Sequence, residues 1–160
     1  MKRWLIPAAV VAGLIVSAGP AAAAPPTTPG TDPVDVTFTN TDCGFDVEID
    51  VVGKGKTIDF GDGRLIVPSP GLTATLTAAN GKTVEYVITG TFHVQVMANG
   101  NQEFKVTGRN LLFRPAPPDP NDAGIFLTTG NFNFIVDQDG NEVTGFAGSG
   151  PVVNICDILR

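Results

Sequence analysis

The sequence predicts an all-β protein, and three observations lead to that prediction. Apolar residues recur at every second position over much of the chain after residue 34, which is the period of a strand with one buried face. Glycine, asparagine, aspartate and proline interrupt this alternation at short intervals, as the turns between strands do. The same region shows no stretch with the spacing of an amphipathic helix.

Residues 1–23 are predicted to be a secretory signal peptide. Lys2 and Arg3 precede the apolar run 4–16, and four alanines at 21–24 follow it. The apolar run is shorter than the ~20 residues that a membrane-spanning helix needs, so we expect no stable membrane anchor. Cleavage after residue 23 would make the protein a secreted, extracellular one.

The mature chain is expected to contain one folded domain. Residues 24–33 hold four prolines and no periodicity, and we interpret them as a disordered tether. Residues 34–160 then form a single domain, long enough to bury a core. The loss of Lys2 and Arg3 leaves 8 basic side chains against 16 acidic ones, a formal net charge of −8. A protein of that charge repels nucleic acid, so we expect no nucleic-acid partner.

The expected strands present their apolar residues with a consistent parity. The segment 83–97 is the clearest case, and segments 104–112 and 126–136 continue its even parity, whereas segment 45–51 has an odd one. In the segment 83–97, the predicted inward residues are Val84, Tyr86, Ile88, Phe92, Val94 and Val96.

This parity also constrains the turns, because residues that face each other across a pair of strands lie on the same face. A plain two-residue turn at Asn99 and Gly100 would place an apolar residue opposite a charged one. We therefore predict a three-residue or bulged loop over the NGN segment, with Val96 opposite Phe104. A hairpin of the same kind is expected at 80–82.

Three of the long segments carry a central glycine, namely Gly90, Gly108 and Gly130. Strands of this length must bend, and glycine is found where strands coil around a barrel or cross between packed sheets. We predict a single antiparallel meander that closes into a β-barrel of about eight strands. A two-sheet β-sandwich is the alternative.

Cys43 and Cys156 are the two cysteines of the chain, and in an exported protein two cysteines most often pair. We predict a disulfide between them that joins the first strand to the last and so closes the barrel. In the chain-entropy account such a bond contributes roughly 4 to 5 kcal/mol.

The sequence shows no pattern of a catalytic or metal site, and we expect no cofactor. The one histidine, His93, lies on the outward parity, so no Ser-His-Asp set can be built around an inward site. Zinc would need several cysteine and histidine ligands. Residues 137–142 resemble a calcium loop only superficially and are predicted to form a hairpin turn.

Polar residues on the inward parity are the informative exceptions. Asn110 and Thr128 interrupt an apolar face, and a proline-rich connection at 114–123 is expected over the same end of the sheet. A few polar groups among aromatic walls are typical of a barrel mouth that orients a mostly apolar ligand. The candidate ligand-binding residues are Tyr86, Ile88, Phe92, Asn110, Phe126 and Thr128. Alternatively, these polar groups hydrogen-bond to backbone at a bend.

The order of several short motifs resembles small secreted actinobacterial proteins. The motifs are CGF (43–45), GKGKT (53–57), SPGLTATLT (69–77), ITGTFH (88–93), TGRNLL (107–112), TTGNFNF (128–134), DQDGN (137–141) and a terminal NIC. The resemblance implies export and a single domain, and it implies no active site. In outline the long-stranded meander is also similar to lipocalin-type and allene-oxide-cyclase-type barrels, a likeness of fold alone.

Three hypotheses of function follow from these observations. We favour a secreted module that binds a small apolar ligand inside the barrel. The second hypothesis is a barrel enzyme of the cyclase or isomerase type, which would need an inward acid or base. The third is a structural or interaction protein of the cell envelope, which would need an exposed apolar patch or an open sheet edge.

Overall fold

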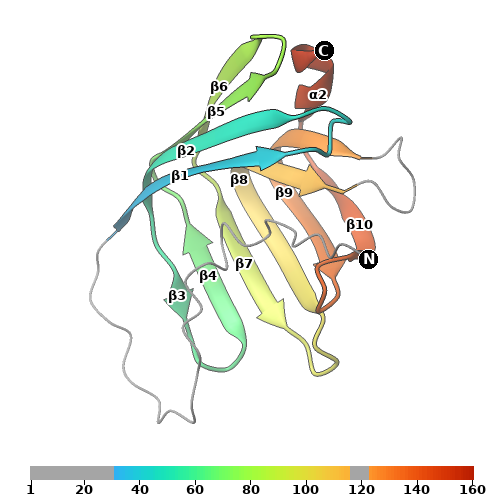
Figure 1. The fold of residues 1–160 in the computed structure, drawn as a ribbon. Helices are drawn as coiled ribbons and strands as arrows, with labels where there is room; N and C mark the ends of the chain where they lie inside the picture. Colours follow the sequence, from blue (N-terminus) through green and yellow to red (C-terminus); the bar gives the residue numbers. More distant parts are fainter. Residues whose placement is uncertain (1–30, 116–122) are drawn as a thin grey trace.

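The computed structural model describes residues 31–115 and 123–160, which form an all-β domain with one short helix (Figure 1). The strands make two antiparallel sheets, a smaller one in the order β1-β2-β5-β6 and a larger one in the order β10-β9-β8-β7-β4-β3, with β11 also paired to β9. The smaller sheet consists of β1 (Asp32–Asn40), β2 (Val47–Gly55), β5 (Leu72–Ala78) and β6 (Thr83–Ile88). The larger sheet consists of β3 (Ile58–Asp59), β4 (Arg64–Pro68), β7 (Thr91–Val96), β8 (Gln102–Arg114), β9 (Gly124–Val136), β10 (Glu142–Ser149) and β11 (Val152–Asn154).

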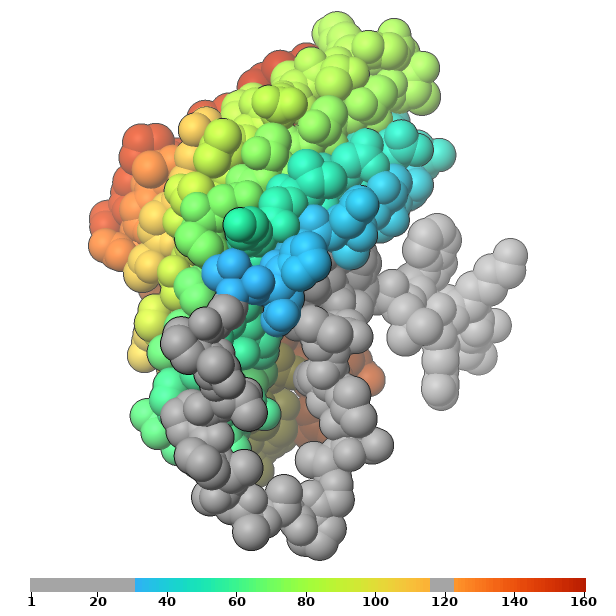
Figure 2. All heavy atoms as spheres, turned by 90° about the vertical axis from the view of Figure 1, so that its left-hand side faces the viewer, coloured from blue at the N-terminus to red at the C-terminus, as the bar shows by residue number. Residues whose placement is uncertain are grey.

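No closed barrel is found among the described residues, and the two-sheet alternative fits at least as well. After β2 the chain leaves the smaller sheet to form β3 and β4, returns for β5 and β6, and crosses again into β7. Figure 2 shows this division from the side, with the smaller sheet over the upper part of the molecule and the β3–β4 region projecting below β1. Alternation in a sequence indicates which face a residue occupies, but not which strand lies beside it.

The smaller sheet packs its inner face on the halves of β8 and β9 nearest to their connection, and on α2 (Ile155–Leu159). The alternation of β2 and β5 is responsible, because their inward residues are fully buried while threonines and acids face outward. The fully buried residues of this region, called the first core below, are Cys43, Val47, Ile49, Val51, Ala74, Leu76, Ala78, Leu111, Ile125, Leu127, Ile155, Cys156 and Leu159.

The predicted disulfide between Cys43 and Cys156 is confirmed, with 5.2 Å between the two Cα atoms. Its structural setting differs from the prediction. Cys43 lies in the connection between β1 and β2, and Cys156 lies in α2 and not in the last strand. The bond therefore ties a turn to a helix, and it does not make the first and last strands neighbours.

The helix α2 was not expected from the sequence. It has five residues, with Asn154 as its N-cap: the Asn154 side chain accepts a hydrogen bond from the backbone N–H of Cys156. A helix this short spans little more than one turn, so its apolar spacing cannot be told from that of a strand. No helix in the described part of the chain has the length and apolar character needed to span a membrane.

Three-residue hairpin loops are confirmed, but each lies one residue earlier than predicted, at 79–81 and 98–100, and a third occurs at 138–140. In each loop the backbone N–H of the preceding residue donates to the carbonyl of the residue four positions later. Gly81, Gly100 and Gly140 close the loops with φ of +86°, +85° and +82°. The register after Gly100 is wrong by two residues, because the loop begins at Ala98 and Val96 pairs with Gln102. A slip of two keeps the parity, so the same side chains still face inward.

Bends at the central glycines are also confirmed. Gly90 lies where the chain crosses from β6 to β7, and Gly108 pairs with Gly130 in the middle of β8 and β9, with φ of +79° and +134°. Arg114 and Glu142 pair with opposite ends of β9, about 40 Å apart if that strand were straight. Their side chains are only 2.8 Å apart. The β8–β9 hairpin is therefore folded over on itself.

The predicted signal peptide and most of the predicted tether lie outside the described residues. The first strand begins at Asp32, two residues before the expected start of the domain.

Candidate functional site

Six of the ten phenylalanines lie on the face of the larger sheet that is inside the folded β8–β9 hairpin. The register explains this grouping, because Phe92 is paired through Val106 to Phe132 in a row across β7, β8 and β9. The six residues, called the phenylalanine cluster, are Phe92, Phe104, Phe126, Phe132, Phe134 and Phe146.

The rings of the cluster contact one another in two groups. Phe104 and Phe134 are stacked, with centroids 4.8 Å apart and an interplanar angle of 5°. Phe146 meets Phe126 and Phe132 edge-on, at 5.3 Å and 6.3 Å. Offset-stacked and edge-on contacts are the favourable arrangements of aromatic rings, so the cluster presents an ordered aromatic surface.

This aromatic surface is incompletely covered. Phe132 is the one member that is fully buried, at 6% exposure, and the other five rings are half-buried. Within the described residues, the fully buried members of this second apolar region are Val106, Leu112 and Phe132, against thirteen in the first core. Half-buried aromatic rings leave apolar surface that a bound apolar molecule could cover.

An ion pair borders the cluster where the two ends of the folded hairpin meet. The Nε and Nη2 atoms of Arg114 donate to the two carboxylate oxygens of Glu142, at 2.9 Å and 2.8 Å. The guanidinium carbon also lies 5.6 Å from the centre of the Phe146 ring. Bidentate pairs of this kind fix both side chains. Two register shifts in β10, between Glu142 and Ala147, accompany the placement of Phe146 over the cluster.

Asn110 and Thr128 lie opposite each other at the bend, and both are buried. The amide Nδ2 of Asn110 donates to the carbonyl of Thr107 at 3.0 Å, and the hydroxyl of Thr128 donates to the carbonyl of Asn110 at 3.4 Å. The Asn110 side chain packs against Gly90. These hydrogen bonds stabilise backbone at the bend.

The structure divides the six candidate ligand-binding residues between two regions. Phe92 and Phe126 belong to the phenylalanine cluster, with the two polar residues of the bend beside them. Tyr86 and Ile88 pack against the first core from β6. The guanidinium carbon of Arg109 lies 5.5 Å from the centre of the Tyr86 ring.

Sequence reasoning did not identify Phe146, Arg114 or Glu142 as parts of one site. The parity of residues 104–134 indicated that their phenylalanines face inward. It carried no signal for an ion pair between residues 28 positions apart, which exists because the hairpin is folded. Bulges in β10 also remove the alternation that would have marked Phe146 as inward.

The other residues that were considered as catalytic or metal-binding candidates lie on the surface or in turns. His93 is exposed on the outward face of β7, as expected. Asp137 forms the predicted hairpin turn, since its carboxylate accepts from the backbone N–H groups of Asp139 and Asn141. The pKa of Asp137 is lowered, chiefly by the side-chain hydrogen bond from Asn141 and to a smaller extent by these backbone hydrogen bonds. Among the described residues, no cluster of histidine, cysteine, aspartate and glutamate has a geometry that could hold a metal ion.

No family model matches the sequence, and no match was found among curated proteins or solved structures. The assignment of function therefore depends on the geometry of the chain itself.

Proposed function

We propose that this protein binds a small, mostly apolar molecule at the phenylalanine cluster. The observation that carries the proposal is the set of five half-buried rings on the inner face of the folded β8–β9 hairpin. Burying the exposed part of such rings under a ligand is favourable by about 25 cal/mol per Å². The proposed site contains Phe92 and Phe126 of the candidate residues, with Asn110 and Thr128 at its inner border.

The surroundings of the cluster favour binding over catalysis. A cyclase or isomerase needs an acid or base that is free to exchange a proton with its substrate. At this site the carboxylate of Glu142 is held by both nitrogens of the Arg114 fork, and the amide of Asn110 donates to backbone. Both groups are engaged in holding the hairpin.

We further propose that the protein acts outside the cell. A disulfide between Cys43 and Cys156 indicates an oxidising compartment, because cytosolic thiols are kept reduced. An extracellular protein with an apolar site would carry or sequester molecules of low solubility in water.

Thermal melts of the oxidised protein with palmitic acid, retinol and menadione test the proposal, since these probes offer an aliphatic chain, a polyene and a flat ring system. A ligand that binds the folded state alone raises the midpoint, and we expect this for at least one probe. A native mass spectrum of secreted material should also contain a bound mass.

Two matched variants locate the effect. Phe134→Ala removes one ring of the stacked pair in the cluster, whereas Phe38→Ala removes one ring of the edge-on pair Phe38–Phe113 beside the first core. We expect Phe134→Ala to lose the rise in midpoint and Phe38→Ala to keep it. Absence of any shift in the parent protein, or an equal loss in both variants, would contradict the proposal.

A further inference from the structure

The opposite, outward face of the larger sheet carries a recess of about 200 Å³, formed by β4, β7, β8 and the turn between β3 and β4. It is separate from the phenylalanine cluster, because its side chains alternate with those of the cluster along the same strands. The recess is lined by the aromatic ring of one residue, one aliphatic side chain and several polar side chains. These residues are Phe60, Arg64, Ile66, His93, Gln95 and Glu103.

The strand register builds this recess in two rows. Arg64, Gln95 and Glu103 face one another across β4, β7 and β8. Ile66, His93 and Lys105 form the next row. The first row is polar throughout, and the second contributes an aliphatic floor at Ile66.

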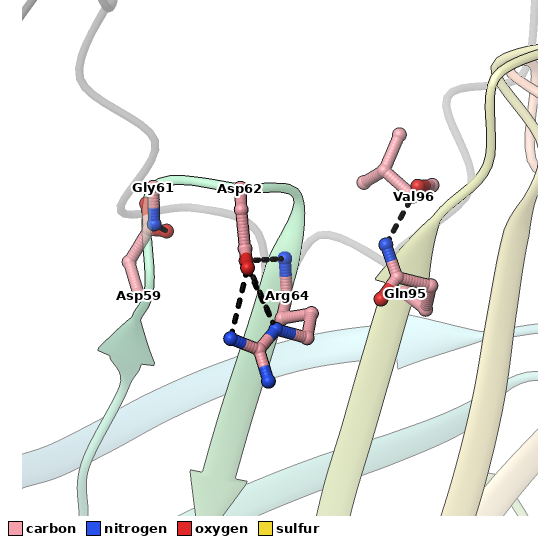
Figure 3. A network of polar contacts seen from close by, with 6 residues as sticks. All are labelled: Asp59, Gly61, Asp62, Arg64, Gln95 and Val96. Atoms are coloured by element: carbon pink, nitrogen blue, oxygen red, sulfur yellow. Dashed lines mark hydrogen bonds and ion pairs between the residues drawn. The ribbon is translucent and has the colours of Figure 1, made fainter.

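Arg64 is held in place before any ligand arrives (Figure 3). The carboxylate of Asp62 accepts from the backbone N–H of Arg64 at 3.2 Å and from its Nε at 2.9 Å, and Nη2 lies 2.8 Å from the same carboxylate. Desolvation raises the pKa of Asp62, but the hydrogen bonds and charge of Arg64 together outweigh it and lower the pKa. The pair is therefore ionised at neutral pH.

Phe60 forms an aromatic wall of the recess. The guanidinium carbon of Arg64 lies 5.0 Å from the centre of the Phe60 ring, which orients the ring. The ring is nevertheless 48% exposed. Because Arg64 lies over one face of the ring, the exposed part that remains for stacking is on the other side.

The charges in the recess cancel. Arg64 is paired with Asp62, and the Nζ atom of Lys105 lies 3.3 Å from a carboxylate oxygen of Glu103. A charged ligand would have to compete with one of these ion pairs. A neutral ligand with several hydroxyl groups could instead bond to the remaining donors and acceptors of Gln95, Glu103 and His93.

We propose that this recess binds a neutral sugar ring. Sugars have apolar C–H faces that stack on aromatic rings and a rim of hydroxyl groups that both donate and accept, and the recess combines Phe60 and Ile66 with polar side chains in this way.

Amide-resolved NMR titrations of the oxidised protein with neutral oligosaccharides test the proposal. Suitable probes are cellohexaose, laminarihexaose, chitohexaose and a linear mannohexaose at millimolar concentration. We expect at least one of them to shift the amide signals of Phe60, Arg64 and Gln95. Phe60→Ala should weaken that binding about tenfold or more, and Phe60→Tyr should keep it because the ring remains.

Val87→Ala is the matched control, because Val87 is an equally exposed apolar residue on the smaller sheet, at 50%. It should leave sugar binding unchanged. The proposal is overturned if no oligosaccharide shifts these amides, if Phe60→Ala binds as the parent does, or if a sulfated heparin hexasaccharide binds here more tightly than the neutral probes. None of these results bears on the apolar site, whose residues lie on the other face of the sheet.

Discussion

The two apolar regions of this domain differ in how completely they are covered. The first core lies between the smaller sheet, the bent hairpin and α2, and it contains thirteen fully buried residues and both cysteines. The phenylalanine cluster lies on the other face of the same hairpin and has most of its rings half-buried. One side of the hairpin is therefore part of a closed core, while the rings on its other side keep part of their surface exposed.

The residue types explain the difference. The first core consists of small and aliphatic side chains, such as Ala74, Ile49 and Leu76, which are fully buried and pack together. The phenylalanine cluster instead consists of large rings, most of which are half-buried.

Removal of the disulfide should have the largest effect, because it acts on the first core. The double variant Cys43→Ser, Cys156→Ser should lose about 4 to 5 kcal/mol of unfolding free energy. It also removes the sulfur that accepts from the backbone N–H of Ile125. Urea denaturation measures the loss. An unchanged midpoint would mean that the first core does not depend on this bond.

A pair of alanine substitutions compares the two regions directly. Ile49→Ala in the first core should cost about 2 to 5 kcal/mol, since Ile49 is fully buried. Phe134→Ala should cost about 1 to 2 kcal/mol although it removes a larger side chain, because the ring is half-buried. The same denaturation experiment on both variants checks the order. A larger loss for Phe134→Ala would show that the cluster is a closed core.

Asn110→Leu tests the boundary between the regions. In the parent protein the carbonyl of Thr107 accepts a hydrogen bond from Asn110 Nδ2. The change leaves this carbonyl without that partner, so we expect a loss of about 1 to 3 kcal/mol of unfolding free energy. The matched variant Thr129→Leu changes an exposed residue nearby in β9 and should cost much less. If Asn110→Leu is as stable as the parent, the amide is free to serve a ligand instead.

The smallest effect is expected at Asp42, beside Cys43. Burial raises the pKa of Asp42, partly offset by a side-chain hydrogen bond from Asn40. A carboxyl whose folded pKa is raised destabilises the fold once it ionises, so the cost appears as pH rises above 3.8 and is fully present at neutral pH. Asp42→Asn should therefore raise the melting temperature slightly at pH 7 and not at pH 3. A gain of equal size at both pH values would exclude this cause.

Much of the fold could be predicted from sequence because its signals are local. Alternation marked the buried faces of β2 and β5, glycines marked the bends, and an isolated pair of cysteines marked the disulfide. The division into two sheets and the register after Gly100 could not be predicted. Neither changes which residues alternate along a strand, and alternation was the only signal available.

The candidate site was predictable only in part. Parity placed Phe92 and Phe126 on an inward face, but it could not show that the smaller sheet covers the opposite face of the hairpin. Tyr86 and Ile88 share that parity and nevertheless belong to the first core, because the chain changes sheets at Gly90. The parity of a residue therefore indicates its face only within one sheet, and it cannot be extended across a crossing between two sheets.

A titration observed on the phenylalanine rings tests the central claim most directly. Protein with ¹³C-labelled phenylalanine is titrated with the probe that gives the largest thermal shift, and two ring pairs are compared. We expect the signals of Phe104 and Phe134 to move while those of Phe38 and Phe113 beside the first core stay in place. Equal movement of both pairs, or movement of Phe38 and Phe113 alone, would contradict the assignment of the ligand site to the phenylalanine cluster.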